Sequence, residues 1–306
     1  MNIVLLAGGV GGAKLAQGLA ALLPPEQLTI IVNTGDDFTH LGLPISPDLD
    51  TVMYTLAGIA NRETGWGRAD ESWRTISEVT RLGGPDWFRL GDLDLATHLT
   101  RAHVLQNGGH LTQATQQLCQ HFGVRCPILP MSNQPASTLV ETEEGVLPFQ
   151  TWFVQKRWQP AVKRIILPEN AQASRSVILA LQKADLILIA PSNPYVSINP
   201  ILNVYPVRES LADAPGAVVA VTPIIAGEAV KGPAAKMMAE MGIPVTQESI
   251  VLFYEGLIDG FVFDERDQGA LDHLDIPQLC TQTWMQTDED RRRLAQEVLT
   301  FAQSLL

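Results

Sequence analysis

The chain has 306 residues, of which 46% are hydrophobic, and a formal net charge of −12 at pH 7. This length predicts one large α/β domain or two modest ones. The negative charge argues against nucleic acids and anionic membranes as partners, because both are bound by clustered Lys and Arg. The cysteines Cys119, Cys126 and Cys280 lack the spacing of a zinc site or a disulfide framework. We expect a soluble cytoplasmic protein, because a strand begins at residue 3 and no apolar run reaches transmembrane length.

The first 14 residues, MNIVLLAGGVGGAK, predict a strand, a glycine-rich turn and the start of a helix. Residues 3–7 have the composition of a buried parallel strand, and helical spacing follows from Ala13. Backbone N–H groups at such a helix start, together with the helix dipole, favour an anion, and glycine lets a phosphate approach closely. We therefore predict a phosphate or diphosphate site, with a tight turn that binds nothing as the alternative. Its residues are Gly8, Gly9, Gly11, Gly12 and Lys14.

The turn does not match two common nucleotide-binding patterns. A dinucleotide fingerprint requires a third glycine where Lys14 stands. A P-loop requires a glycine before the lysine and a Ser or Thr after it, where this chain has Ala13 and Leu15. The glycine turn therefore belongs to neither of these two classes.

Short apolar runs alternate with helical patterns along the chain, which predicts an α/β fold with a doubly wound, mainly parallel sheet. The expected strands are 3–7, 29–33, 124–129, 185–190, 217–222 and 250–253. The expected helices are 12–22, 47–61, 71–82, 93–105, 110–122, 171–184, 205–213, 232–242 and about 288–305. Residues of about 45–123 are expected to form a helical flap. Strands at 138–141, 146–153 and 162–167 indicate a β insertion of about 134–168 in a single domain.

Polar residues follow several of the predicted strands, and ligands of open α/β sheets bind beyond the carboxyl ends of strands. Ser192 and Asn193 lie between two prolines that stiffen their loop, and an amide there can read a nucleobase edge. Lys231 and Gly232 follow the strand at 217–222. We predict that these loops converge on one nucleotide.

The segment Ser46-Pro47-Asp48-Leu49-Asp50 predicts a helix start, with Ser46 as N-cap. Asp48 would compensate the dipole in the first turn. Positions 48 and 50 lie about 200° apart on a helix, so the two carboxylates would not share one ion. Asp50 is therefore a candidate base, metal ligand or hydroxyl acceptor that faces the cleft. Further along the flap, Asp92 is expected as an N-cap, and His98 and His103 as surface or packing residues.

Seven segments together resemble the 2-phospho-L-lactate transferase family over residues 1 to about 267. They are GGVGGAKL at 8–15, NTGDD at 33–37, SPDLDTVMYTLAG at 46–58, RLGDLDLATHL at 89–99, APSNP at 190–194, SINPIL at 197–202 and VKGPAAKMM at 230–238. The resemblance implies a Rossmann-like fold and a role in making coenzyme F-420. Such enzymes move 2-phospholactate or phosphoenolpyruvate from a guanosine-diphosphate-activated donor to the deazaflavin alcohol FO, and release GMP. They require Mg²⁺, and we expect a homodimer.

The resemblance also implies roles for single residues. The family's FO contacts fall on Asp50 and Arg89, and we expect Asp50 to accept the proton of the FO hydroxyl, with direct metal ligation as the alternative. Asp36 or Asp37 is the expected partner of Mg²⁺. Phosphates should lie on residues 8–12 and guanine near Ser192 and Asn193, so Gly11→Val should abolish nucleotide binding without unfolding the protein. A neutral deazaflavin ring needs an apolar slot, for which Met53, Tyr54 and Trp66 are candidates.

The chain departs from the family pattern at Asn133, Ala226 and Glu228, which stand in PMSN and PIIAGEAVKG where PMSD and PIIGGKAVKG are more usual. Two other functions remain: a nucleotide-sugar-binding regulatory protein of a related Rossmann-like family, and an NAD-dependent oxidoreductase. The RLGD and PSNP segments favour the transferase over the first, and the missing third glycine disfavours the second. The identity of the donor acid stays open, because such acids differ by ~1–3 kcal/mol in a pocket.

Overall fold

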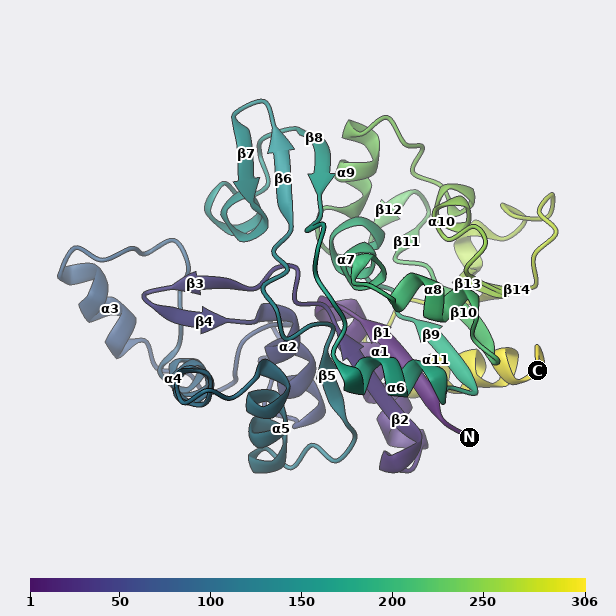
Figure 1. Ribbon diagram of the computed structural model, residues 1–306. Helices are drawn as coiled ribbons and strands as arrows, with labels where there is room; N and C mark the ends of the chain where they lie inside the picture. The colour runs from purple at the N-terminus through teal and green to yellow at the C-terminus, as the bar shows by residue number, and fades with distance from the viewer.

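The computed structural model describes residues 1–306 as a central seven-stranded parallel sheet with helices on both faces (Figure 1). The strand order is β14-β13-β10-β9-β1-β2-β5, with every neighbouring pair parallel. The predicted α/β fold class is therefore confirmed. The strands are β1 (Ile3–Ala7), β2 (Leu28–Val32), β5 (Ile128–Pro130), β9 (Leu186–Ile189), β10 (Ala217–Val221), β13 (Gly260–Asp264) and β14 (Gln278–Thr281).

Successive residues of the central strands face two separate hydrophobic cores. In β1, Ile3 and Leu5 pack into one core, whereas Val4 and Leu6 pack into the other. The first core lies under α1 (Gly9–Leu22), α2 (Pro47–Leu56), α5 (Leu111–His121) and α11 (Asp288–Gln303). The second lies under α6 (Arg175–Gln182), α7 (Asn199–Asn203), α8 (Val207–Ala212), α9 (Ala234–Glu240) and α10 (Gln247–Phe253). Burial on both faces explains why these strands read as continuous apolar runs.

The order of the strands reverses between β1 and β9. From β1 the chain adds β2 and β5 on one side, and later adds β9, β10, β13 and β14 on the other. Ligands of open α/β sheets bind at such a switch point, outside the carboxyl ends of the strands. The loop after β1 begins at Gly8 and the loop after β9 contains Ser192, so the topology brings two of the predicted loops together.

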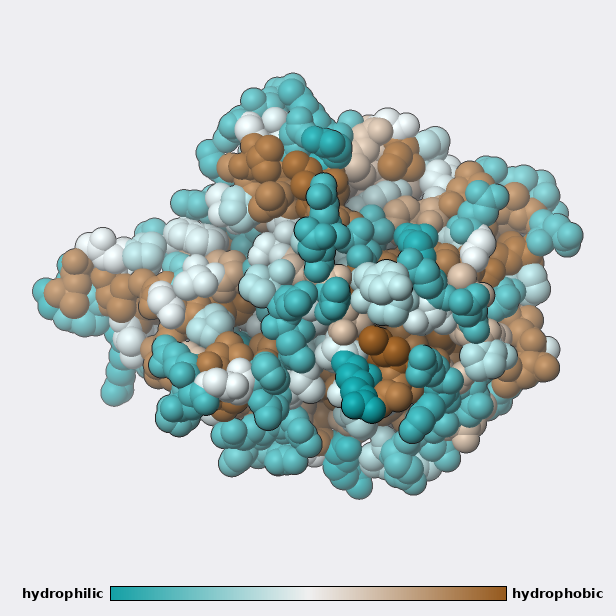
Figure 2. Space-filling model, in the orientation of Figure 1, coloured by the Kyte–Doolittle hydropathy of each residue, from teal (hydrophilic) through white to brown (hydrophobic).

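Between β2 and β5 the chain forms a hairpin of β3 (Phe38–His40) and β4 (Leu43–Ile45), followed by four helices. Two of them, α3 (Arg74–Arg81) and α4 (Asp92–Gln106), lie away from the sheet at the left of Figure 1. Apolar side chains gather over α3 at the left edge of Figure 2, and Leu82 at the end of that helix is 72% exposed. None of the helices combines the length and hydrophobicity needed to span a bilayer.

A second, antiparallel sheet stands between β5 and β9, at the top of Figure 1. It contains β6 (Leu139–Thr142), β7 (Gly145–Pro148) and β8 (Val162–Ile166). The strand predicted at 146–153 ends at Pro148, and residues 151–155 form a helical turn that buries Trp152. Proline lacks the N–H that would continue the ladder. The remaining hairpin consists of β11 (Ile224–Ile225) and β12 (Glu228–Ala229).

The strand predicted at 250–253 is wrong, because these residues belong to α10. Thr246 caps this helix by accepting a hydrogen bond from the Ser249 N–H at 3.2 Å. Ile250 is buried while Leu252 is 55% exposed, although both would share one face of a strand. The sheet instead takes β13 and β14 from later in the chain.

Candidate active site at the β1–β9 switch point

The glycine turn and the loop after β9 are joined directly. The Ser192 hydroxyl accepts a hydrogen bond from the Gly8 N–H at 3.1 Å and donates one to the Gly8 carbonyl at 2.7 Å. A Cβ at Gly11 would lie only 2.2 Å from the Pro191 carbonyl oxygen. Gly11 is therefore required for the packing of α1 against the β9 loop. The expectation that Gly11→Val would leave the fold intact needs correction, because the added side chain would displace the helix.

Two buried carboxylates, one of them at the start of α1, meet on the side-chain amide of Asn33. The Gly9 N–H donates to the Asp48 carboxylate, and the Asn33 amide donates to Asp48 at 3.0 Å and also to Asp36. Burial raises the pKa of Asp48 to about 6. Burial, and then the nearby Asp48 carboxylate, raise the pKa of Asp36 well above its usual range. The sequence placed Asp48 only in the first turn of α2, whereas its carboxylate lies at the positive end of a different helix.

Asp37 occupies a neighbouring position with a different partner. The Ser46 hydroxyl donates to Asp37 Oδ2 at 2.7 Å, so it does not cap α2 as predicted. Asp37 Oδ1 is buried without a hydrogen-bond partner. Burial raises the pKa of Asp37 well above its usual range, and the Ser46 hydrogen bond only partly offsets this.

These carboxylates can be compared with what Mg²⁺ requires. No group of three or more His, Cys, Asp or Glu side chains converges as a metal cage. Mg²⁺ is usually bound by one or two carboxylates, with waters and phosphate oxygens completing its shell. Asp36 and Asp48 fit that requirement, because both lie on the Asn33 amide and a dication would offset their repulsion. Asp36 therefore shares the Asn33 amide with Asp48, a neighbour that the sequence did not indicate, rather than with the adjacent Asp37.

Asp50 lies on α2 in a buried ionic cluster. Its Oδ1 is paired with the guanidinium of Arg101 from α4, a residue only 1% exposed. The imidazole Nδ1 of His98 lies 3.7 Å from Asp50 Oδ2, and its Nε2 lies 3.5 Å from Asp94. Asp50 Oδ2 has no hydrogen-bond partner. Asp50 Oδ2 therefore keeps an unused acceptor position, but it is buried between α2 and α4 and does not face an open cleft as expected.

Sequence reasoning missed Arg101 and gave His98 only a surface or packing role. The available signal was their i, i+3 spacing on one helix, which puts both on the same face. Nothing in the sequence indicated that this face would meet α2. His98 is in fact buried beside Asp50.

Arg89 lies in the flap beside aromatic side chains. Its guanidinium stacks over Trp73 at 4.7 Å from the ring centre. Phe88, the residue before Arg89, meets Phe38 edge to face, with 4.8 Å between the ring centres. No hydrogen bond or ion pair joins Arg89 to Asp50. Of the expected slot residues, Met53 and Tyr54 are buried in the core, whereas Trp66 is 51% exposed.

The two predicted lysines approach one another, although they are far apart in sequence. Lys14 donates to the Met285 carbonyl at 2.7 Å, and Lys231 donates to the Thr64 carbonyl. Burial lowers the pKa of Lys14, and the nearby charges of Arg291 and Lys231 lower it further. Gly232 turns the chain after Lys231 with a φ of +78°. The side-chain carbonyl of Asn193 accepts from the Tyr195 N–H at 3.0 Å, and its amide nitrogen donates to the Met237 Sδ at 3.5 Å, so at most one amide N–H is left for a base.

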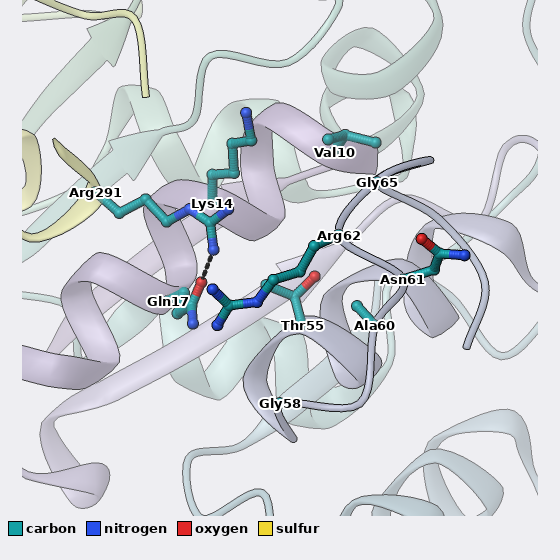
Figure 3. A pocket seen from close by; sticks show the side chains of 10 residues that line it. All are labelled: Val10, Lys14, Gln17, Thr55, Gly58, Ala60, Asn61, Arg62, Gly65 and Arg291. Carbon is teal, nitrogen blue, oxygen red and sulfur yellow. Dashed lines mark hydrogen bonds between the residues drawn. The ribbon is translucent and has the colours of Figure 1, made fainter. Parts of the chain in front are cut away.

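A hollow of about 470 Å³, open solvent included, lies beside the glycine turn (Figure 3). Its walls come from α1, the end of α2 with the following loop, and α11. It is lined by Val10, Lys14, Gln17, Thr55, Gly58, Ala60, Asn61, Arg62, Gly65 and Arg291. Three of these ten residues are cationic, in a chain whose net charge is −12.

The family model described as 2-phospho-L-lactate transferase CofD matches residues 3–304. The chain belongs to this family. A phosphoenolpyruvate transferase of Kitasatospora aureofaciens is 45% identical over 89% of this chain and 87% of its own length. A 2-phospho-L-lactate transferase of Methanosarcina mazei is 39% identical over 97% of this chain and 99% of its own length.

The solved structure of a UPF0052 family member from Bacillus halodurans has a TM-score of 0.65 over 97% of this chain and 98% of its own. At 18% identity, that likeness shows the fold alone. The family and its curated members identify the chain as a CofD-type transferase of coenzyme F-420 biosynthesis. This favours the transferase over the regulatory protein and the oxidoreductase.

Proposed function

We propose that this CofD-type transferase moves the phospho-three-carbon-acid unit of a guanosine-diphosphate-activated donor to the deazaflavin alcohol FO. The acid is 2-phospholactate or phosphoenolpyruvate, the two that name its relatives. The products are an F-420 precursor and GMP. One observation carries the proposal: three features of a phosphoryl-transfer site lie close together in the fold. The glycine turn follows β1, Asp36 follows the neighbouring β2, and α2 contributes the carboxylates of Asp48 and Asp50. Asp36 and Asp48 have raised pKa values, and Asp50 has an unpartnered oxygen.

Phosphoryl transfer depends more on position and charge neutralisation than on covalent catalysis. The start of α1 would hold the diphosphate, with the residues from Gly8 to Gly12 along its backbone. Asp36 and Asp48 would hold Mg²⁺, which when bound would neutralise charge on the phosphates. Ser192 would hold the loop after β9 against the glycine turn through its two hydrogen bonds to Gly8.

Asp50 would act on the acceptor. The FO hydroxyl oxygen would form a bond to the acid-bearing phosphorus, the bond from that phosphorus to the GMP oxygen would break, and the hydroxyl proton would pass to Asp50 Oδ2. Arg101 would hold Asp50 in position through the other oxygen. A positioned carboxylate base contributes ~10²–10⁴-fold in rate. Arg89 and its stacked Trp73 would lie against the deazaflavin.

A nucleotide competition assay tests this proposal against the two other functions. The protein is incubated with FO, Mg²⁺ and an activated acid, and GMP release is followed while guanosine, uridine or adenosine diphosphate is added. We expect guanosine diphosphate to inhibit most strongly. Preferential binding of uridine nucleotides without GMP release would instead support the regulatory protein.

A further inference from the structure

The hollow beside the glycine turn is lined by two arginines, Arg62 and Arg291, in addition to the predicted phosphate-binding Lys14. Lys14 and Arg291 line it, and the Lys231 amine would lie 2.8 Å from a Cβ at Gly65 on its rim. Val10 belongs to the glycine turn and also lines the hollow, and its side chain would lie 3.2 Å from a Cβ at Gly65. An anion that continues from the diphosphate along α1 would therefore enter this hollow.

Two arginines in the hollow already meet on one carboxylate. Arg62 from the loop after α2 lies 3.1 Å from Asp288 Oδ2, and Arg291 from α11 lies 3.0 Å from Asp288 Oδ1. Their guanidiniums are thus held at a separation that a single carboxylate spans. Asp288 is half exposed at the start of α11, so it lies at the edge of the hollow.

Positive charges outnumber negative charges around the hollow. Lys14, Lys231 and the two arginines contribute four positive charges, and Asp288 and Asp290 on α11 contribute two negative charges. In Figure 3 the Arg62 side chain extends across the hollow, and Arg291 is held by Gln17. The Arg291 Nη1 reaches both Gln17 and Asp288, whereas its Nε is buried without a hydrogen-bond partner. Arginine is suited to carboxylate recognition because its fixed fork of donors matches the two oxygens.

We infer that Arg62 and Arg291 form a carboxylate subsite that binds the acid end of the activated donor. The inference rests on the proposed function, since it assigns the part of that donor which the glycine turn does not hold. The subsite selects for a carboxylate and is indifferent to the groups that distinguish lactate from enolpyruvate. Lys14 and Lys231 then neutralise the phosphate that joins the acid to the nucleotide.

Binding calorimetry without FO tests the inference independently of turnover. The ligands are guanosine diphosphate, the activated acid and its carboxamide analogue, each titrated into the parent protein, Arg62→Gln, Arg291→Gln and Arg292→Gln. Arg292 is the matched control, because it is the exposed neighbour of Arg291 on α11 and has no ion pair within the structure. We expect the parent and the control to bind the acid about tenfold more tightly than the carboxamide, as one charge-assisted pair allows.

In Arg62→Gln and Arg291→Gln the preference for the acid should fall to about twofold or less, while guanosine diphosphate affinity stays within about twofold of the parent. Equal affinity of the parent for acid and carboxamide would overturn the inference. An equal loss of guanosine diphosphate affinity in both variants would also overturn it, because the arginines would then serve the nucleotide. An acid preference in both arginine variants as large as that of the parent would overturn it too. If the parent prefers the acid, both variants lose that preference and no transfer to FO occurs, the subsite stands and the proposed function is refuted.

Discussion

Two substitutions on α2, Asp48→Asn and Asp50→Asn, should change the stability of the protein in opposite directions at pH 7. The residues lie two positions apart and both are buried, at 6% and 5% exposure. Asp48 faces another carboxylate across the Asn33 amide, whereas Asp50 is paired with Arg101. The same chemical change therefore removes an unfavourable charge at one position and a compensating charge at the other.

The magnitude for Asp48 follows from its pKa, which rises from 3.8 to about 6 on folding. Each pKa unit corresponds to about 1.4 kcal/mol, so the ionised carboxylate costs roughly 3 kcal/mol above pH 6. The native state binds this proton more tightly than the unfolded chain does, so stability falls as the pH rises from about 4 to about 6. Asparagine keeps an acceptor for the Gly9 N–H. We expect Asp48→Asn to be roughly 1–3 kcal/mol more stable than the parent at pH 7 and similar to it at pH 4.

Asp50→Asn leaves the Arg101 guanidinium buried without its partner, which typically costs about 3–5 kcal/mol. Urea denaturation of both variants between pH 4 and pH 8, without Mg²⁺ or nucleotide, measures both effects. The reasoning would be refuted if Asp48→Asn were less stable than the parent at pH 7, or if its effect did not change with pH. A buried carboxylate such as Asp48 that lowers stability is expected where the residue serves binding rather than folding.

Four further outcomes follow from the geometry. Gly11→Ala should destabilise the protein by roughly 1–3 kcal/mol in thermal unfolding, because its Cβ meets the Pro191 carbonyl; an unchanged melting temperature would contradict the packing role. Arg89→Ala should raise the KM for FO and leave guanosine diphosphate affinity unchanged in calorimetry, and a parallel loss of both would place Arg89 on the nucleotide. Asp50→Asn should lower kcat by ~10²–10⁴-fold with an unchanged Mg²⁺ requirement, whereas a raised requirement would make Asp50 a metal ligand. Asp48→Asn should raise the Mg²⁺ concentration needed for half-maximal rate, and an unchanged value would exclude Asp48 from the metal site.

The fold class could be predicted because both faces of the sheet are covered, which leaves short apolar runs such as β1 and β10 between helical patterns. The run at 250–253 was misread because four apolar residues fit a strand or a helix equally well, and only the Thr246 cap and the exposed Leu252 decide between them. The capping of α3 could not be foreseen either. Asp92 accepts from the Thr75 N–H at 3.0 Å, so it serves a helix that precedes it in the chain rather than its own.

The candidate site was predictable where its residues lie in one segment or directly follow a strand of the parallel sheet. The glycine turn and the Ser192 loop could be placed together, because both follow strands whose carboxyl ends share one edge of the sheet. The pairing of Asp50 with Arg101 depends on how α4 of the flap packs against α2, and no local pattern encodes that. The same holds for Asp48 at the start of α1 and for Arg291, which reaches the hollow from the last helix.

Mass spectrometry of the deazaflavin product tests the central claim most directly. The protein, Mg²⁺ and FO are incubated with the guanosine-diphosphate-activated form of 2-phospholactate or of phosphoenolpyruvate, alongside Asp50→Asn as the inactive control. We predict that FO gains the mass of one phospho-acid unit with one of the two donors, that GMP appears in equal amount, and that Asp50→Asn forms at least ~100-fold less product per unit time. Unmodified FO with both donors, or a turnover rate of Asp50→Asn within a few-fold of the parent, would contradict it.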